Sequence, residues 1–278
     1  MRKIYDLHVH THYSIDGEKS ADNSILNLSK KAKGQGFSGI AFTDHFDADL
    51  ISAKYESHDS KNIRLDIEKA QYELNDNNFT VINGIEIGSQ RYFGELCSEE
   101  IKNYGYDLVI SSIHIPGANI NYLLSMAKLD QWSDTEIISV FNLYMDDLLY
   151  TAKHCDFDIL AHITYPMRYF RRFKKDHLTP IENYYDIYDE IFKQLIYRGK
   201  ALEVNTSGLR QGNGETFPGP LLIKRYLELG GEMFTVGSDS HSFSDCTADV
   251  REVTDMLSGL GARYSCYFKE RKPIMIKL

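Results

Sequence analysis

Short apolar runs rich in β-branched residues alternate along this chain with longer segments whose apolar residues recur at helical spacing. Each short run is bounded by Gly, Asn, Asp or Ser, which is typical of buried strands between turns. The expected strands cover 3–8, 38–43, 80–86, 107–113, 157–162, 200–205 and 233–238. The expected helices cover 21–33, 62–75, 135–153, 183–198, 219–229 and 246–258. This alternation predicts a parallel sheet with right-handed helical crossovers.

The turn after the first expected strand distinguishes two α/β architectures. An open dinucleotide-binding sheet would have a Gly-rich phosphate turn there, whereas residues 8–17 read HVHTHYSIDG. We therefore expect an α/β fold of the closed or nearly closed (β/α) barrel type. No linker, repeat or low-complexity tract interrupts the sequence, so residues 1–278 are expected to form one domain.

Composition and charge exclude several functional classes. The net charge of −9 argues against a general nucleic-acid-binding surface. The cysteines form no CxxC pair, which indicates reduced thiols in a cytosolic protein rather than a disulfide scaffold. Neither an apolar signal segment nor a run of about 18 apolar residues occurs. We expect a soluble, cytoplasmic protein that acts on a small molecule and binds neither nucleic acid nor membrane; its oligomeric state stays open.

Metal-binding residue types fall at or just past the ends of the expected strands. The first strand ends in His8 and His10, whose side chains point the same way and can hold one cation. Because the carboxyl ends of barrel strands form one face, donors from the other strands should join them there. The candidate metal ligands are His8, His10, Asp16, His45, Glu86, His114, His162, Asp239 and His241.

This donor set indicates how many ions bind and of which kind. One metal uses three or four protein ligands, so nine donors indicate two or three divalent ions. Imidazole and carboxylate donors without thiolate suit Zn, Mn or Fe, and Glu86 is suited to bridging two ions. Asp16 also fits a turn. The remaining histidines are expected at the surface or in support of the ligands: these are His12, His58, His154 and His177.

Basic residues follow the fifth and sixth expected strands. Arg168 and Arg210 lie in connections that open on the same rim, and a guanidinium can bind a phosphate through two parallel hydrogen bonds. They are therefore the candidate substrate-binding residues. The neighbouring basic side chains are expected in a solvated loop instead: these are Arg171, Arg172, Lys174 and Lys175.

The motifs that carry these donors resemble the PHP superfamily, named for polymerase and histidinol phosphatase. They are DLHVHTH from residue 6, TDH at 43–45, GIE at 84–86, SSIH at 111–114, LAH at 160–162 and GSDSH at 237–241. The resemblance implies a distorted seven-stranded (β/α) barrel, similar to the TIM barrel, with a trinuclear metal site. Two stretches, LEVNTSGLRQG at 202–212 and YFKERKP at 267–273, look like the histidinol-phosphatase branch.

The resemblance also implies how the donors divide among the ions. One ion would take His8, His10, Glu86 and Asp239, a second Glu86, His114 and His162, and a third Asp16, His45 and His241. Asp16 stands where many members of the superfamily carry His. This difference leaves the identity and occupancy of the third ion open.

The implied reaction is hydrolysis of L-histidinol phosphate to L-histidinol and phosphate, a phosphomonoesterase step of histidine biosynthesis. Divalent ions lower the pKa of a bound water and bind phosphate oxygens. Arg168 and Arg210 would stabilise charge on the equatorial oxygens, and Asp239 or His241 would assist the leaving alkoxide. Together with Glu86, these are the candidate catalytic residues. Asp47, Asp49 and Tyr169 are candidates for contact with the imidazole end.

Three other functions remain open at this stage. The first is another phosphoesterase of the same superfamily, which would act on nucleotides, oligonucleotides or phosphotyrosine. The second is a metallo-hydrolase that cleaves C–N bonds, although such enzymes need no arginine pair. The third is a binding module without catalysis, which the full donor set disfavours. Metal analysis of the protein, together with phosphate release from a small substrate panel, would distinguish them.

Overall fold

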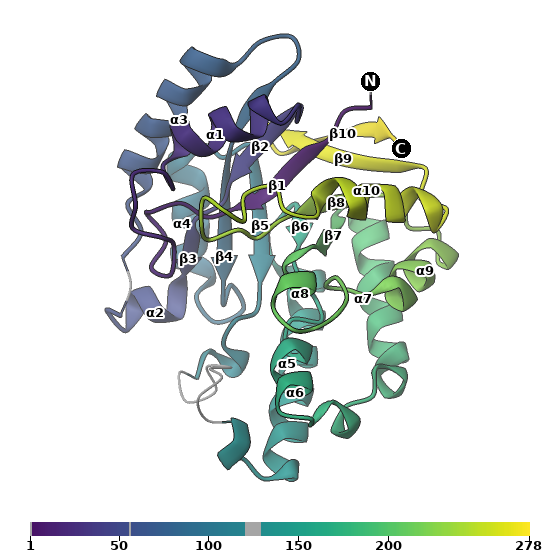
Figure 1. Ribbon diagram of the computed structural model, residues 1–278. Helices are drawn as coiled ribbons and strands as arrows, with labels where there is room; N and C mark the ends of the chain where they lie inside the picture. Colours follow the sequence, from purple (N-terminus) through teal and green to yellow (C-terminus); the bar gives the residue numbers. More distant parts are fainter. Residues whose placement is uncertain (1, 56, 120–128) are drawn as a thin grey trace.

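Parallel strands form a nearly closed barrel in the computed structural model, which describes residues 2–55, 57–119 and 129–278 (Figure 1). Their hydrogen-bonded order is β1 (Tyr5–Val9), β2 (Gly39–Phe42), β4 (Thr80–Gly88), β5 (Leu108–Ser112), β6 (Ile159–Leu160), β7 (Ala201–Asn205) and β8 (Phe234–Gly237). A bridge between Val9 and Ser240 returns the chain after β8 to β1. The predicted barrel of seven parallel strands is confirmed.

The second expected strand continues past a break. After Thr43 and Asp44 the chain pairs with β4 again as β3 (His45–Asp47), with His45 opposite Glu86. The break lets the buried Asp44 carboxylate accept hydrogen bonds from the Thr11 amide at 2.7 Å and from Ser14 Oγ at 2.8 Å. Asp44 thereby fixes the loop that follows β1.

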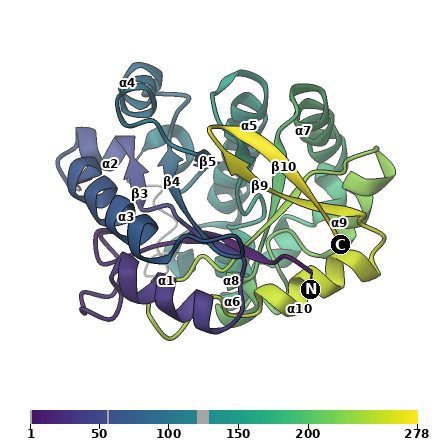
Figure 2. The same cartoon turned by 90° about the horizontal axis from the view of Figure 1, so that it is seen from above.

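Helices surround the strands, as the view from above shows (Figure 2). The six expected helices are confirmed as α1 (Ile25–Gly34), α3 (Ser60–Leu74), α5 (Asp134–His154), α7 (Tyr185–Arg198), α9 (Pro220–Glu228) and α10 (Val250–Gly259). The sequence patterns missed α2 (Ala48–Ser52), α4 (Gly94–Tyr104), α6 (Met167–Arg172) and α8 (Ser207–Arg210). Short 3-10 helices occupy Pro116–Ala118, Leu129–Gln131, Asp176–Leu178 and Ile181–Tyr184. Within the described parts of the chain, no helix is long and apolar enough to cross a membrane.

An antiparallel hairpin covers the amino-terminal end of the barrel (Figure 2). It consists of β9 (Tyr264–Lys269) and β10 (Lys272–Lys277), neither of which the sequence analysis predicted. Cys266 and Phe268 join Leu7 in a small apolar cluster inside the barrel, apart from the larger core between strands and helices. The ring of Tyr267 stacks on Tyr5 with centroids 4.4 Å apart. Apolar packing therefore fills this end and leaves the opposite end for polar groups.

The hairpin turn is tied to the starts of β5 and β6. Glu270 and Arg271 have φ of 50° and 64°, and their amides donate to the Asp107 side chain at 3.0 Å and backbone carbonyl at 2.8 Å. The Arg271 guanidinium pairs with Asp158, whose side chain is only 4% exposed, and with Asp156 at 2.9 Å. One arginine thus neutralises a nearly buried carboxylate.

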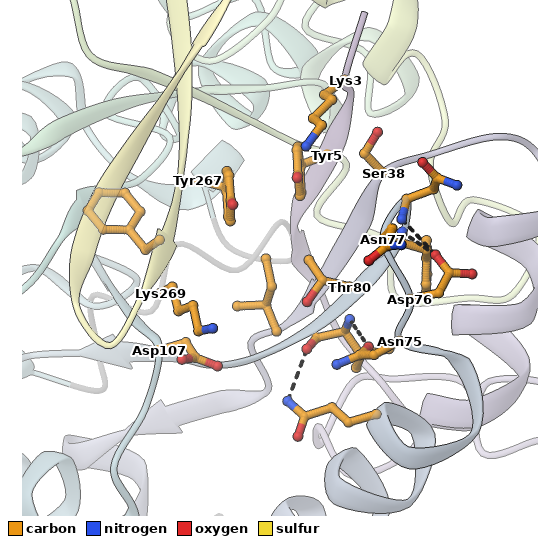
Figure 3. Close-up of a pocket in the computed structure, with 16 residues that line it drawn as sticks. Lys3, Tyr5, Ser38, Asn75, Asp76, Asn77, Thr80, Asp107, Tyr267 and Lys269 are labelled. Carbon is orange, nitrogen blue, oxygen red and sulfur yellow. Dashed lines mark hydrogen bonds between the residues drawn. The ribbon is translucent and has the colours of Figure 1, made fainter. Parts of the chain in front are cut away.

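A polar hollow of about 460 Å³ lies beside this hairpin (Figure 3). Lys3, Tyr5, Asp76, Tyr267 and Lys269 contribute to its lining, and none of its lining residues is a histidine. None of the nine candidate metal ligands lines it.

We predict that Arg271→Ala lowers the free energy of unfolding by about 2 kcal/mol, because it leaves the Asp158 carboxylate buried without its main cation. Urea unfolding followed by circular dichroism measures the change. Arg263→Ala is the matched control: its pair with Glu232 is exposed and should contribute less than about 1 kcal/mol. Equal effects of the two substitutions would contradict a specific role for the Arg271 contact.

Candidate active site

A register irregularity in β1 places two histidines inside the barrel. The pairing of β1 with β2 shifts between Asp6 and Val9, so Leu7 packs in the inner cluster whereas Val9 packs in the outer core. His8 and His10 are fully buried, and His8 Nδ1 reaches across the barrel to Glu203 Oε1 on β7, 2.6 Å away. Such a bulge redirects side chains next to a functional site.

The buried carboxylate of Glu86 lies at the centre of the cluster. Glu86 Oε2 is 2.9 Å from His45 Nδ1 and 3.2 Å from His8 Nε2. Glu86 Oε1 is 2.9 Å from His162 Nε2 and 3.3 Å from His114 Nε2. Imidazoles from β1, from the start of β3 and from the segments after β5 and β6 therefore surround one carboxylate of β4.

The structure brings all nine predicted donors together. Three tight groups are His8–His10–Asp239, His8–Glu86–His162 and His10–His45–His241, in each of which the donor atoms lie within 4.8 Å of one another. A fourth combines His45 and His114 with Asp47, a carboxylate that the sequence analysis assigned to a different role. Asp16 joins them through Oδ2, which lies 3.2 Å from His241 Nε2.

Two of these donors lie on left-handed backbone. His162 has φ of 27° and Asp239 has φ of 52°, a region that residues with a β-carbon rarely adopt. Each follows a strand by two residues, so the turn directs the side chain back over the barrel end. Such conformations persist where the surrounding structure enforces them, and they concentrate at functional sites.

Neighbouring polar groups hold four of the imidazoles through Nδ1. Beyond the Glu203 contact to His8, Ser14 Oγ is 3.1 Å from His10 Nδ1. Asp47 Oδ1 is 2.9 Å from His114 Nδ1, and the Asp239 carbonyl is 3.0 Å from His241 Nδ1. These contacts orient each Nε2 toward the cluster, as outer partners do in metal sites.

Glu203 is the supporting residue that sequence reasoning missed. Its second carboxylate oxygen accepts hydrogen bonds from the His162 amide at 2.9 Å and from Asn205 Nδ2 at 3.1 Å, so it contacts two candidate ligands at once. The available signal was a charged residue between the apolar residues Leu202 and Val204 of an expected strand.

The buried carboxylates and imidazoles of the cluster shift one another's pKa values. Burial would raise the pKa of Glu86, but His8, His114 and His45 hold it well below its ordinary value. Burial would likewise lower the pKa of His8, yet the carboxylates of Glu203, Glu86 and Asp239 raise it well above the usual range. These opposed shifts are the response of a buried donor set to the charges of its own members.

Several polar atoms of the cluster are close to one another without forming well-aligned hydrogen bonds. Glu86 Oε2 and His45 Nδ1 are buried and 2.9 Å apart, yet neither has an aligned hydrogen-bond partner among the described residues, and His8 Nε2 lies 3.1 Å from His10 Nε2. In this arrangement two imidazole nitrogens face each other beside a buried carboxylate oxygen. A divalent ion bound between them would coordinate all three atoms. The residues present therefore fit divalent metal ions.

The cluster opens into a hollow of about 650 Å³ at the carboxyl ends of the strands. Arg168 and Arg210 both line it, as do Tyr165, Asp239 and His241. The sequence analysis placed the two arginines in connections, and the structure places them in the short helices α6 and α8.

The segment after Arg168, predicted as a solvated loop, is helical as far as Arg172, so the prediction is wrong for Arg171 and Arg172. Arg171 lies in α6, pairs with Glu215 at 2.5 Å and bonds to the carbonyl of Asn213. Lys175 pairs with Asp134 at 2.6 Å. These ion pairs fix the connection after β6 to α5 and to the segment before α9, which the local sequence did not reveal.

The three residues predicted to contact the imidazole end of the substrate lie in different surroundings. Asp47 lines the hollow but is bonded to His114. Asp49 accepts hydrogen bonds from Ser89 Oγ at 2.8 Å and from the Leu50 amide at 2.9 Å. Asp49 and Tyr169 are not among the described residues that line the hollow.

Fold and cluster together define a parallel-stranded barrel with a histidine and carboxylate metal site at its carboxyl end. The family model that describes the PHP domain matches residues 6–207. The chain therefore belongs to the PHP domain family, as the motifs predicted.

Curated relatives agree with this membership, and a solved structure shares the fold. A probable histidinol-phosphatase of Clostridium acetobutylicum is 30% identical over 245 residues, 86% of each chain. A histidinol-phosphatase of Lactococcus lactis is 27% identical over 87% of this chain and 85% of that protein. The crystal structure of histidinol phosphate phosphatase from Lactococcus lactis, complexed with zinc, L-histidinol and phosphate, has a TM-score of 0.72 at 21% identity, covering 98% of this chain and 99% of that one.

Proposed function

We propose that this chain is a metal-dependent phosphomonoesterase that hydrolyses L-histidinol phosphate to L-histidinol and phosphate in histidine biosynthesis. The observation that carries the proposal is the convergence of the donors around Glu86 in the same hollow as Arg168 and Arg210. The names of the curated relatives, which cover most of the chain, support the substrate.

The proposed ligand sets are those that the resemblance to the family implies, and the structure supports them only in bringing their donors into one cluster. One ion would be held by His8, His10, Glu86 and Asp239, a second by Glu86, His114 and His162, and a third by Asp16, His45 and His241. Zn, Mn or Fe would suit these ligands, and the Lactococcus lactis neighbour is complexed with zinc. When bound, such ions supply an activated water for attack and neutralise charge on the phosphate.

The chain's own residues would orient the substrate and support the leaving group. Arg168 and Arg210 line the hollow beside the cluster and would bind phosphate oxygens that gain charge in the transition state. Asp239 and His241 line the same hollow, and either would assist the departing alkoxide. Asn205 Nδ2 and Ser207 Oγ, each 3.2 Å from Asp239 Oδ2, hold that carboxylate in place.

Removal of the metals should abolish activity. Exhaustive chelation is expected to end phosphate release, and addition of Mn or Zn should restore it, because the water and the phosphate charge both depend on the ions. Glu86→Gln should be among the most damaging single substitutions, since it removes the central carboxylate of the cluster. Glu190→Gln is the control, because Glu190 lies in α7 and pairs with Lys153 at 3.2 Å rather than with a candidate ligand. Full activity of a sample shown to be metal-free would refute the proposal.

Glu203→Gln tests the support of His8. We expect metal affinity to fall by about 10- to 100-fold, because the partner that orients His8 loses its charge. Competition with a chromophoric chelator measures the affinity without recourse to turnover. Glu190→Gln again serves as the control, and an unchanged affinity in Glu203→Gln would mean that the 2.6 Å contact to His8 does not tune the site.

A substrate panel tests the identity of the substrate. The ammonium and imidazole of histidinol phosphate offer binding energy at a distance from the phosphate, which can orient the reacting end. We expect kcat/KM for L-histidinol phosphate to exceed that for p-nitrophenyl phosphate and AMP by roughly two orders of magnitude, or about 3 kcal/mol.

All three substrates are compared in one metal-loaded preparation. Comparable rates would leave an unspecific phosphatase. A preference for a nucleotide, an oligonucleotide or phosphotyrosine would identify another phosphoesterase of the same family.

A further inference from the structure

Two tyrosines enclose the guanidinium of Arg168 at the edge of the hollow. Arg168 Cζ lies 4.0 Å from the ring centroid of Tyr165 and 4.5 Å from that of Tyr169. Arg168 Nη2 donates to the hydroxyl of Tyr165 at 2.6 Å and also to that of Tyr169. The two hydroxyl oxygens are themselves 2.9 Å apart, so three polar groups share one small network.

The hydrogen atoms of this network leave one donor unused. A guanidinium has no acceptor, and each phenol carries a single hydrogen. Both hydrogens of Nη2 go to the two phenol oxygens, and one phenolic hydrogen lies between these oxygens. The other phenolic hydrogen has no acceptor among the described residues. A ligand with an acceptor oxygen would complete the network.

The positions of the rings decide which tyrosine carries the unused hydrogen. Tyr165 lines the hollow, and its ring centroid is 5.2 Å from that of His162 and 5.7 Å from that of His114. Tyr169 is 5% exposed, its ring meets that of Tyr165 edge to face, and it is not among the described residues that line the hollow. The shared hydrogen is therefore assigned to Tyr169, which leaves the hydrogen of Tyr165 for the space beside the metal cluster.

We propose that the Tyr165 hydroxyl donates a hydrogen bond to a phosphate oxygen of the substrate, and that Tyr169 is a positioning residue for Tyr165 and Arg168. This assignment rests on the proposed phosphomonoesterase function. A phosphate oxygen is an acceptor without hydrogens, and it would meet the phenol and the remaining Nη1 hydrogen of Arg168 on the same side of the hollow. Gln211, which accepts from Nη1, limits the rotation of the guanidinium.

The experiment compares Tyr165→Phe, Tyr169→Phe and the double variant in the metal-loaded protein. The control is Tyr184→Phe, because the Tyr184 hydroxyl contacts Asn142 and does not line the hollow. Each phenylalanine keeps the ring and its packing. The first readout is the inhibition constant of inorganic phosphate, which requires only a phosphatase assay with the best substrate of the panel. The second is the separate change in kcat and KM.

We expect Tyr165→Phe to weaken phosphate inhibition by about 10-fold or more, since it removes a hydrogen bond to a charged group. Tyr169→Phe should weaken it by about 2- to 4-fold, because the donor to the ligand remains and only its placement is relaxed. In the double variant, Tyr169→Phe should weaken phosphate inhibition by a smaller factor than it does alone, since both substitutions act through the Tyr165 hydroxyl. Tyr184→Phe should match the unmodified protein.

Several results would overturn the assignment. An unchanged phosphate inhibition constant in Tyr165→Phe would do so. A larger change of this constant in Tyr169→Phe than in Tyr165→Phe would also do so, because Tyr169 would then be the residue that donates to the phosphate. A higher KM for histidinol phosphate with unchanged phosphate inhibition would place Tyr165 at the imidazole end instead. Loss of bound metal from Tyr165→Phe would show that it acts through His162. If the substrate is another phosphomonoester, phosphate inhibition still tests Tyr165, so the two proposals fail separately.

Discussion

The burial of the Glu86 carboxylate is the constraint on which the rest of the carboxyl end depends. A buried carboxylate costs several kcal/mol unless opposite charge and hydrogen bonds surround it. Here imidazoles from β1, β3 and the segments after β5 and β6 surround it. These rings are brought toward one carboxylate by three features of the backbone: the register shift in β1, the break between β2 and β3, and the left-handed conformation of His162.

Stability and chemistry are divided between the two ends of the barrel. At the amino-terminal end, Phe268 and Cys266 of the hairpin close an apolar interior, and Arg271 ties the turn to Asp158. This packing fixes the strands on which the donors lie, so the unsatisfied polar groups at the other end need not hold the fold together. The division is characteristic of barrels whose active sites lie at the carboxyl ends of the strands.

The sequence predicted what depends on local pattern and on strand ends. Apolar runs located the seven strands of the barrel path, and the residue types just beyond them located the donors around Glu86. Long-range contacts were not predictable in this way. Arg171 resembles a solvated side chain until Glu215, 44 residues away, is placed beside it, and the short β3 has no apolar run of its own. Glu203 was visible as an isolated charge in a strand, but its partner His8 comes from the other end of the sequence.

The two arginines are held in place before any ligand enters, which supports the proposed binding of a phosphate. Arg210 Nη2 donates to the Ser238 carbonyl at 2.7 Å, and its Nη1 donates to Thr206 Oγ1 at 3.1 Å. Arg168 is held by two phenols and Gln211. An exposed arginine would lose rotamer entropy on binding, of about 1 kcal/mol for each such side chain, whereas these side chains have been ordered during folding. In the proposed reaction their remaining N–H donors would face charge that develops on the phosphate oxygens, and groups already held in place stabilise such charge without reorganisation.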